Sequence, residues 1–207
     1  MLTFNLFVYG TLMRGFRANS FIPEESEMLK GKIAGNLYHY SAGFPIVEIL
    51  KHPQSVIGTR DYIADIAKQN DLNRVEPECL PFNLNYGRVY GELYKIPYTD
   101  NKDDESIIRQ LDSYEGFRPS SEYNLYNRTL VPVQTDKGII WAWVYNMDKL
   151  PEATVHILSG DWRDCFYSNR GGLRQEIKDV VNKKLMLLDD EDYDDEDCEE
   201  EDDDDLK

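Results

Sequence analysis

The sequence has few of the residues that build metal centres or disulfide frameworks. It contains only three cysteines and three histidines, all widely spaced: Cys79, Cys165, Cys198, His39, His52 and His156. No CxxC or HxxxH pair is present. Scattered cysteines in an odd number indicate ordinary thiols, and the missing ligand spacing argues against a zinc site. We therefore expect no metal and no cofactor.

Long apolar runs are also missing. No stretch approaches the roughly 20 apolar residues that a bilayer-spanning helix needs. The apolar segment from Leu2 to Val8 lacks a basic leader and a small-residue cleavage site. We therefore expect no membrane association and a cytoplasmic location.

A basic excess is absent as well. The formal net charge is -16, but residues 189–207 hold 15 Asp or Glu and one Lys, so residues 1–188 are close to neutral. This excludes the electrostatic pattern of nucleic-acid binding and favours a small-molecule ligand. The acidic run cannot bury apolar surface, which predicts a disordered tail over 189–207. The length and composition of residues 1–188 predict a single domain.

Five segments read as β-strands because they are rich in aromatic and branched residues. They cover residues 3–9, 32–40, 88–96, 125–133 and 139–145. Gly35 and Gly91 interrupt two of them, which is typical of bulges, bends in a curved sheet or close approach of another backbone. The pattern predicts an α+β fold with a small mixed β-barrel of about five to seven strands and a few flanking helices.

Helices are predicted over 103–115 and 174–188 from their apolar periodicity. Residues 50–87 contain no convincing strand and at most a short helix near 62–67. We expect this region to be a long excursion from the barrel, of the kind that often covers a site.

Glu115 is the most informative single residue. The predicted helix over 103–115 places Leu111 and Tyr114 inward, and Glu115 falls in the same apolar arc as Leu111. Glu115 also precedes Gly116, a predicted C-cap, where the helix dipole disfavours a further negative charge. Burial and the dipole would both raise its pKa, as a general acid/base near neutral pH requires. From these residues alone, the alternative is a solvated glutamate at a frayed helix end.

The segment Tyr9-Gly10-Thr11-Leu12 ends the first strand in a glycine turn. Successive backbone N–H groups in such a turn can form an anion-binding concavity that fits a carboxylate. Tyr126 and Arg128 lie on one face of a strand, and Tyr145 ends another. Taken alone, these features are equally consistent with a simple turn and with cross-strand pairs.

Together, in this order, the motifs resemble the gamma-glutamylcyclotransferase-like family, also described as the butirosin-cyclotransferase-like fold. The resemblance covers Phe7 to about Tyr145. The blocks that carry it are FVYGTL at 7–12, GNLYHY at 35–40 with the following Phe44-Pro45, VYGELY at 89–94, LDSYEGF at 111–117, YNRTLVPV at 126–133 and AWVY at 142–145. The region 50–87 departs from the family pattern as an insertion, so it bears on the pocket rim and the leaving group.

The resemblance implies an enzyme that releases 5-oxoproline from a gamma-glutamyl small molecule. It implies Glu115 as the general acid/base and backbone donors at Gly10, Thr11 and Leu12, with Tyr9 as a wall. It also implies Tyr126 near the substrate, Arg128 as structural or electrostatic support, and Tyr145 as a further pocket residue. The resemblance thus predicts one catalytic residue and seven residues that bind the substrate or support the pocket.

Two alternatives remain open from the sequence. The substrate can be a gamma-glutamyl amino acid, a gamma-glutamylamine, glutathione or another gamma-glutamylated metabolite. The barrel can also be a ligand-binding or interaction module whose acidic tail recruits a basic protein partner, because a fold does not establish a function.

Overall fold

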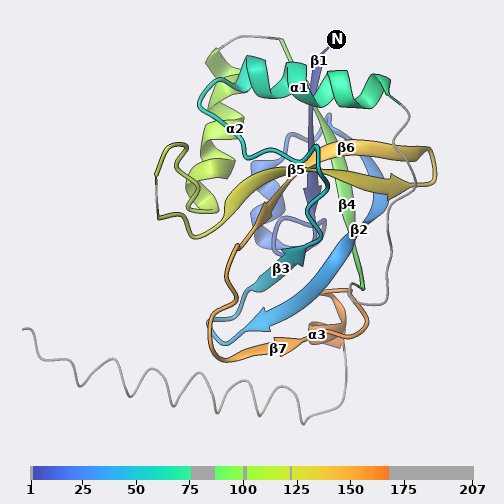
Figure 1. The fold of residues 1–207 in the computed structure, drawn as a ribbon, viewed down its shortest axis with the longest axis vertical. Helices are drawn as coiled ribbons and strands as arrows, with labels where there is room; N and C mark the ends of the chain where they lie inside the picture. The colour runs from blue at the N-terminus through green and yellow to red at the C-terminus, as the bar shows by residue number, and fades with distance from the viewer. Residues whose placement is uncertain (1, 76–86, 100–101, 122, 168–207) are drawn as a thin grey trace, which may run out of the picture.

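The computed structural model describes residues 2–75, 87–99, 102–121 and 123–167. Five strands close into a barrel (Figure 1). They are β1 (Leu2–Val8), β2 (Glu27–Tyr40), β4 (Arg88–Tyr98), β5 (Asn127–Thr135) and β6 (Gly138–Asn146). The order is β2-β4-β1-β6-β5, and β5 returns to pair with β2. Only the β1–β6 pairing among these is parallel. The predicted mixed barrel and the α+β class are confirmed.

The long strand β2 belongs to two sheets. Its first part pairs with β4, and its last six residues pair with β3 (Pro45–Ile49) and β7 (Thr154–His156). The change occurs at Gly35, where a Cβ atom would lie 2.6 Å from the carbonyl oxygen of Glu48. At Gly91 a Cβ atom would lie 2.1 Å from the carbonyl oxygen of Val8. Both glycines are therefore required because another backbone approaches closely.

Apolar side chains are buried at consecutive positions along β1, β5 and β6, so both faces of these strands are covered. The core includes Phe4, Leu6, Ile33, Leu93, Leu130, Val133, Trp141 and Trp143. Trp162, beyond β7, is also fully buried and stacks on His39 with ring centroids 5.0 Å apart. This packing fixes the strand ends from which the site described below is built.

Four helical segments surround the barrel: η1 (Arg17–Phe21), α1 (Tyr62–Arg74), α2 (Lys102–Tyr114) and α3 (Asp164–Tyr167). Helix α2 begins and ends one residue before the predicted span of 103–115. The predicted helix over 174–188 and the predicted acidic tail lie outside the described residues, as does the boundary between them. No helix within the described ranges is long and apolar enough to cross a membrane.

The region 50–87 differs from its prediction in one respect. Its short helix is in fact α1, a helix of 13 residues that lies across one end of the barrel (Figure 1). Gln69 accepts a hydrogen bond from the backbone N–H of Asn5 at 2.8 Å, and Asn73 accepts one from the backbone N–H of Trp141 at 2.8 Å. The described part of this region therefore braces β1 and β6.

Candidate active site

A cavity of about 220 Å³ opens where β1, the end of α2 and the segment before β3 meet. Seven of the eight predicted site residues line it: Tyr9, Gly10, Thr11, Leu12, Glu115, Tyr126 and Tyr145. The remaining lining residues are Phe7, Val8, Phe44, Pro45, Tyr114 and Leu125. Segments far apart in the sequence therefore converge on one pocket, while Arg128 lies outside it.

The turn after β1 is held from both sides. A Cβ atom on Gly10 would lie only 2.2 Å from Cγ of Pro45, so glycine is the residue that fits. The backbone N–H of Met13 donates to the carbonyl oxygen of Gly10 at 2.9 Å, and the N–H of Arg14 donates to the Glu92 carboxylate at 2.7 Å. Glu92 lies in the VYGELY block, but its role in fixing this turn was not predicted.

Three backbone N–H groups of the turn face no protein acceptor. Among the described residues, nothing accepts a hydrogen bond from the N–H groups of Gly10, Thr11 or Leu12. Gly10 and Leu12 are buried and Thr11 is half-buried, and buried backbone donors are normally satisfied. Because these three residues line the cavity, a ligand carboxylate or carbonyl oxygen is a suitable acceptor for them.

Glu115 is placed by the end of α2. Its backbone N–H donates to the carbonyl oxygen of Leu111 at 3.0 Å, and Gly116 then adopts a left-handed φ of 66°. This is the predicted glycine cap. The half-buried Glu115 side chain reaches the cavity and receives no hydrogen bond from any described residue. Burial raises the pKa of the Glu115 carboxyl from 4.5 to about 8.

The predicted inward position of Tyr114 is wrong. The exposed fraction of Tyr114 is 43%, and its ring packs on Phe21 of η1 with centroids 5.0 Å apart. Its hydroxyl lies 3.2 Å from Oγ1 of Thr11. Tyr114 therefore forms part of the cavity mouth. Because it lies one residue before Glu115 on the helix, its side chain points about 100° away from that of Glu115.

The hydroxyl groups of three buried tyrosines of the cavity donate hydrogen bonds to other protein groups. Tyr9 donates to the carbonyl oxygen of Tyr145 at 2.7 Å, and Tyr145 donates to the Asp112 carboxylate at 2.7 Å. Tyr126 donates to the carbonyl oxygen of Pro45 at 2.6 Å. Burial raises the pKa of Tyr9 and Tyr145 well above the ordinary tyrosine value. These tyrosines thus serve as rigid, neutral walls.

Arg128 lies outside the cavity, in a buried ion-pair cluster. It is fully buried, and its guanidinium donates to Asp112 at 2.5 Å, to Asp65 at 2.6 Å and to the carbonyl oxygen of Thr59 at 2.8 Å. These contacts join β5 to α1 and α2. Because Asp112 lies one helical turn before Glu115, the ion pair also anchors the end of α2 that carries Glu115.

Asp65 and Asp112 were not predicted as partners of Arg128. Asp112 lies in the LDSYEGF block three residues before Glu115, and its place in that block was a usable signal. Asp65 offered none, because its contact with Arg128 joins residues 63 positions apart.

Among the described residues, no group of three or more metal-ligating side chains comes together.

Comparison with known proteins finds a family model and several proteins that are similar to this chain. A family model described as "Gamma-glutamyl cyclotransferase, AIG2-like" matches residues 67–164. The gamma-L-glutamyl-butirosin B gamma-glutamyl cyclotransferase of Niallia circulans is 24% identical over 176 residues, which cover 83% of each chain. The chain therefore resembles the gamma-glutamylcyclotransferase-like family. The matched range 67–164 includes Glu115 and Tyr126 but begins after the turn at residues 9–12.

Another relative of this gamma-glutamylcyclotransferase-like chain matches over a shorter stretch. A protein of Halalkalibacterium halodurans, provisionally named as a gamma-glutamylcyclotransferase, is 35% identical over 78 residues. The match covers 38% of the chain and 62% of that protein.

Two solved structures are similar to the chain. An AIG2-like protein from Mus musculus has 21% identity and a TM-score of 0.43, with 74% of this chain and 83% of that chain covered. YkqA from Bacillus subtilis has 24% identity and a TM-score of 0.47, and the match covers 82% of this chain and 44% of YkqA.

Proposed function

We propose that this gamma-glutamylcyclotransferase-like protein is an enzyme that releases 5-oxoproline and a free amine from a gamma-glutamyl compound. The observation that carries the proposal is the pairing of two features in one cavity. The Glu115 carboxyl has a pKa of about 8, and the N–H groups of residues 10–12 lack protein acceptors among the described residues. The similarity to proteins named as gamma-glutamyl cyclotransferases supports the same reaction class.

The reaction is intramolecular. The substrate α-amine attacks its own γ-carbonyl carbon, a C–N bond forms to close a five-membered ring, and the original amide C–N bond breaks. Because the nucleophile is tethered, the protein needs mainly to hold the substrate in attack geometry. The rigid walls of Tyr9, Tyr126 and Tyr145 provide a cavity of fixed shape for this purpose.

Proton transfer falls to Glu115. The ionised carboxylate accepts the proton that the attacking amine loses, and the resulting acid returns it to the departing amine. One group between two nitrogens can carry out both steps, so no nucleophilic Ser or Cys is required. A pKa of about 8 in the free site predicts that kcat/KM rises with pH through this value.

The backbone N–H groups of Gly10, Thr11 and Leu12 hold negative oxygen in this scheme. The substrate α-carboxylate is their preferred acceptor, and the charge that develops on the γ-carbonyl oxygen is a second. The committed hydroxyls of the three buried tyrosines favour this assignment, because those hydroxyls would have to break existing hydrogen bonds to donate to substrate.

The test measures 5-oxoproline by mass spectrometry after incubation with gamma-glutamyl amino acids, gamma-glutamyl-lysine and glutathione. The wild type, Glu115→Gln and Glu105→Gln are compared. Glu105 is a solvent-facing carboxylate on α2 that pairs with Arg109, so its variant should retain activity. Glu115→Gln should lose about 100-fold or more, as expected for a general acid/base.

Full activity of Glu115→Gln would remove the acid/base step. If the wild type binds these compounds without releasing 5-oxoproline, the binding-module alternative is correct. The cytoplasmic location and the single domain over 1–188 stay predictions, as does the protein partner of the acidic tail.

A further inference from the structure

The cavity is too small to enclose a whole gamma-glutamyl conjugate. Its volume of about 220 Å³ is below the roughly 300–1,000 Å³ of pockets that enclose drug-sized ligands. In the proposed reaction the glutamyl unit must lie inside, between the N–H groups of residues 10–12 and Glu115. The leaving amine therefore has to extend past Glu115 to the cavity mouth.

The mouth beside Glu115 is apolar. We define the apolar rim as Phe44, Tyr114 and Leu125, all of which line the cavity. Leu125 lies directly against the Glu115 corner, because its backbone N–H donates to the carbonyl oxygen of Gly116 at 3.3 Å. Leu125 is 51% exposed, so the rim leaves apolar surface in water that a ligand can cover.

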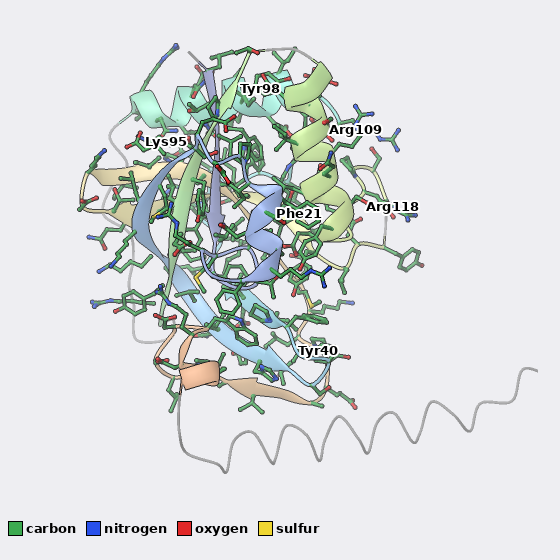
Figure 2. All side chains as sticks on the ribbon, turned by 180° about the vertical axis from the view of Figure 1, so that it is seen from behind. Phe21, Tyr40, Lys95, Tyr98, Arg109 and Arg118 are labelled. Carbon is green, nitrogen blue, oxygen red and sulfur yellow. The ribbon has the colours of Figure 1, made fainter. Side chains whose placement is uncertain are left out.

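Two aromatic pairs hold the rim in place. The ring of Phe44 packs edge-on against Tyr40 with centroids 5.1 Å apart, and it also contacts Tyr126 at 6.2 Å. On the opposite side, Tyr114 packs against Phe21. Figure 2 shows Phe21 on η1 beside α2. The rim therefore presents preformed aromatic faces, which favour stacking by another ring.

Charge at the mouth is scarce. None of the thirteen lining residues is Lys, Arg or His, and Glu115 is the one carboxylic acid among them. Burial raises the pKa of Glu115 to about 8, so at neutral pH it is mostly protonated and attracts a cation weakly. The polar feature of the rim is the hydroxyl pair of Thr11 and Tyr114, 3.2 Å apart.

We propose that the apolar rim is the binding subsite for the leaving amine and selects amines with an aromatic body over short aliphatic and cationic ones. This inference rests on the proposed function for its orientation, since the glutamyl unit must occupy the cavity. Its chemical basis is separate from the acid/base step, because the contacts involve side chains that take no part in proton transfer.

The experiment uses three matched conjugates: gamma-glutamyl-phenethylamine, gamma-glutamyl-ethylamine and gamma-glutamyl-putrescine. The first two differ by one phenyl ring, and the third carries a cationic tail. Binding is measured by calorimetry on Glu115→Gln, in which we expect turnover to be slowed by about 100-fold or more, and 5-oxoproline release is measured on the wild type. Affinity for the phenethyl conjugate should exceed that for each of the others by about tenfold or more.

Leu125→Ser is the decisive variant, and Leu158→Ser is its control. Leu158 is 88% exposed and is not a lining residue, so it matches the loss of an exposed leucine without touching the rim. Each is made in the Glu115→Gln background for the calorimetry. Leu125→Ser should reduce the phenethyl preference by about threefold, while Leu158→Ser should leave it unchanged.

The two measurements separate the two claims. Equal affinities for the three conjugates, tightest binding of the putrescine conjugate, or no binding at all would overturn the subsite. A phenethyl preference that falls by about threefold in Leu125→Ser, combined with no 5-oxoproline from the wild type, would retain the subsite and overturn the proposed enzyme.

Discussion

Glu115 should make the protein less stable as the pH rises. In the native state burial raises its pKa from 4.5 to about 8, whereas in the unfolded chain the carboxyl titrates near its ordinary value. Between these two values the native protein binds one more proton than the unfolded chain. Stability is therefore complete below about pH 4.5 and falls as the pH approaches 8.

The size of the effect follows from the same pKa. Each pH unit between the two values costs about 1.4 kcal/mol, so the whole window sets an upper limit of about 5 kcal/mol. Glu115 faces a cavity that is open to solvent, which screens the charge and lowers the expected loss to about 2 to 3 kcal/mol. Replacement by Gln keeps the shape of the side chain and removes the titration.

The assay compares urea unfolding of the wild type and Glu115→Gln at several pH values from 4.5 to 9. The difference between the two free energies of unfolding isolates Glu115, because the other titrating groups are common to both proteins. We expect the stability of Glu115→Gln relative to the wild type to increase by about 2 to 3 kcal/mol across this range. A difference that does not change with pH would show that the Glu115 carboxyl is not held in a desolvated position.

Two further predictions concern the support of the site. Arg128→Met leaves two buried carboxylates without their cation and should lower the free energy of unfolding by about 3 to 5 kcal/mol, whereas Arg109→Met, at an exposed pair, should change it by less than about 1 kcal/mol. Similar losses in urea unfolding of both variants would contradict the buried ion-pair assignment. Gly10→Ala places a methyl group 2.2 Å from Cγ of Pro45. It should lower the free energy of unfolding by about 1 to 3 kcal/mol and abolish most 5-oxoproline release. A variant with unchanged unfolding midpoint and turnover would show that the turn has room to move.

Local patterns determined the barrel strands. The runs at 88–96 and 139–145 are rich in aromatic and branched residues and became β4 and β6, while Gly35 and Gly91 marked places where another backbone approaches. Strands β3 and β7 were missed. Each is short, and its pairing with the far end of β2 depends on where that strand leaves the barrel.

Helix α1 was underestimated for a different reason. Its buried face carries Asp65 and Gln69 beside Ile66 and Leu72, so its apolar periodicity is weak. The polar members are buried because they bond to Arg128 and to the backbone of β1. Such contacts exist only once the barrel has formed, and the sequence carries no local trace of them.

The sequence by itself marked two local features of the site, the glycine turn at Gly10 and the helix end at Glu115-Gly116, and the family resemblance predicted that they belong to one site. Only the tertiary structure decided what surrounds them. Arg128 lies in a buried ion-pair cluster, and Tyr114 lies at the mouth of the cavity. These outcomes depend on burial, charge pairing and packing between segments that are distant in the chain, and those interactions set the pKa of Glu115 and the character of the rim.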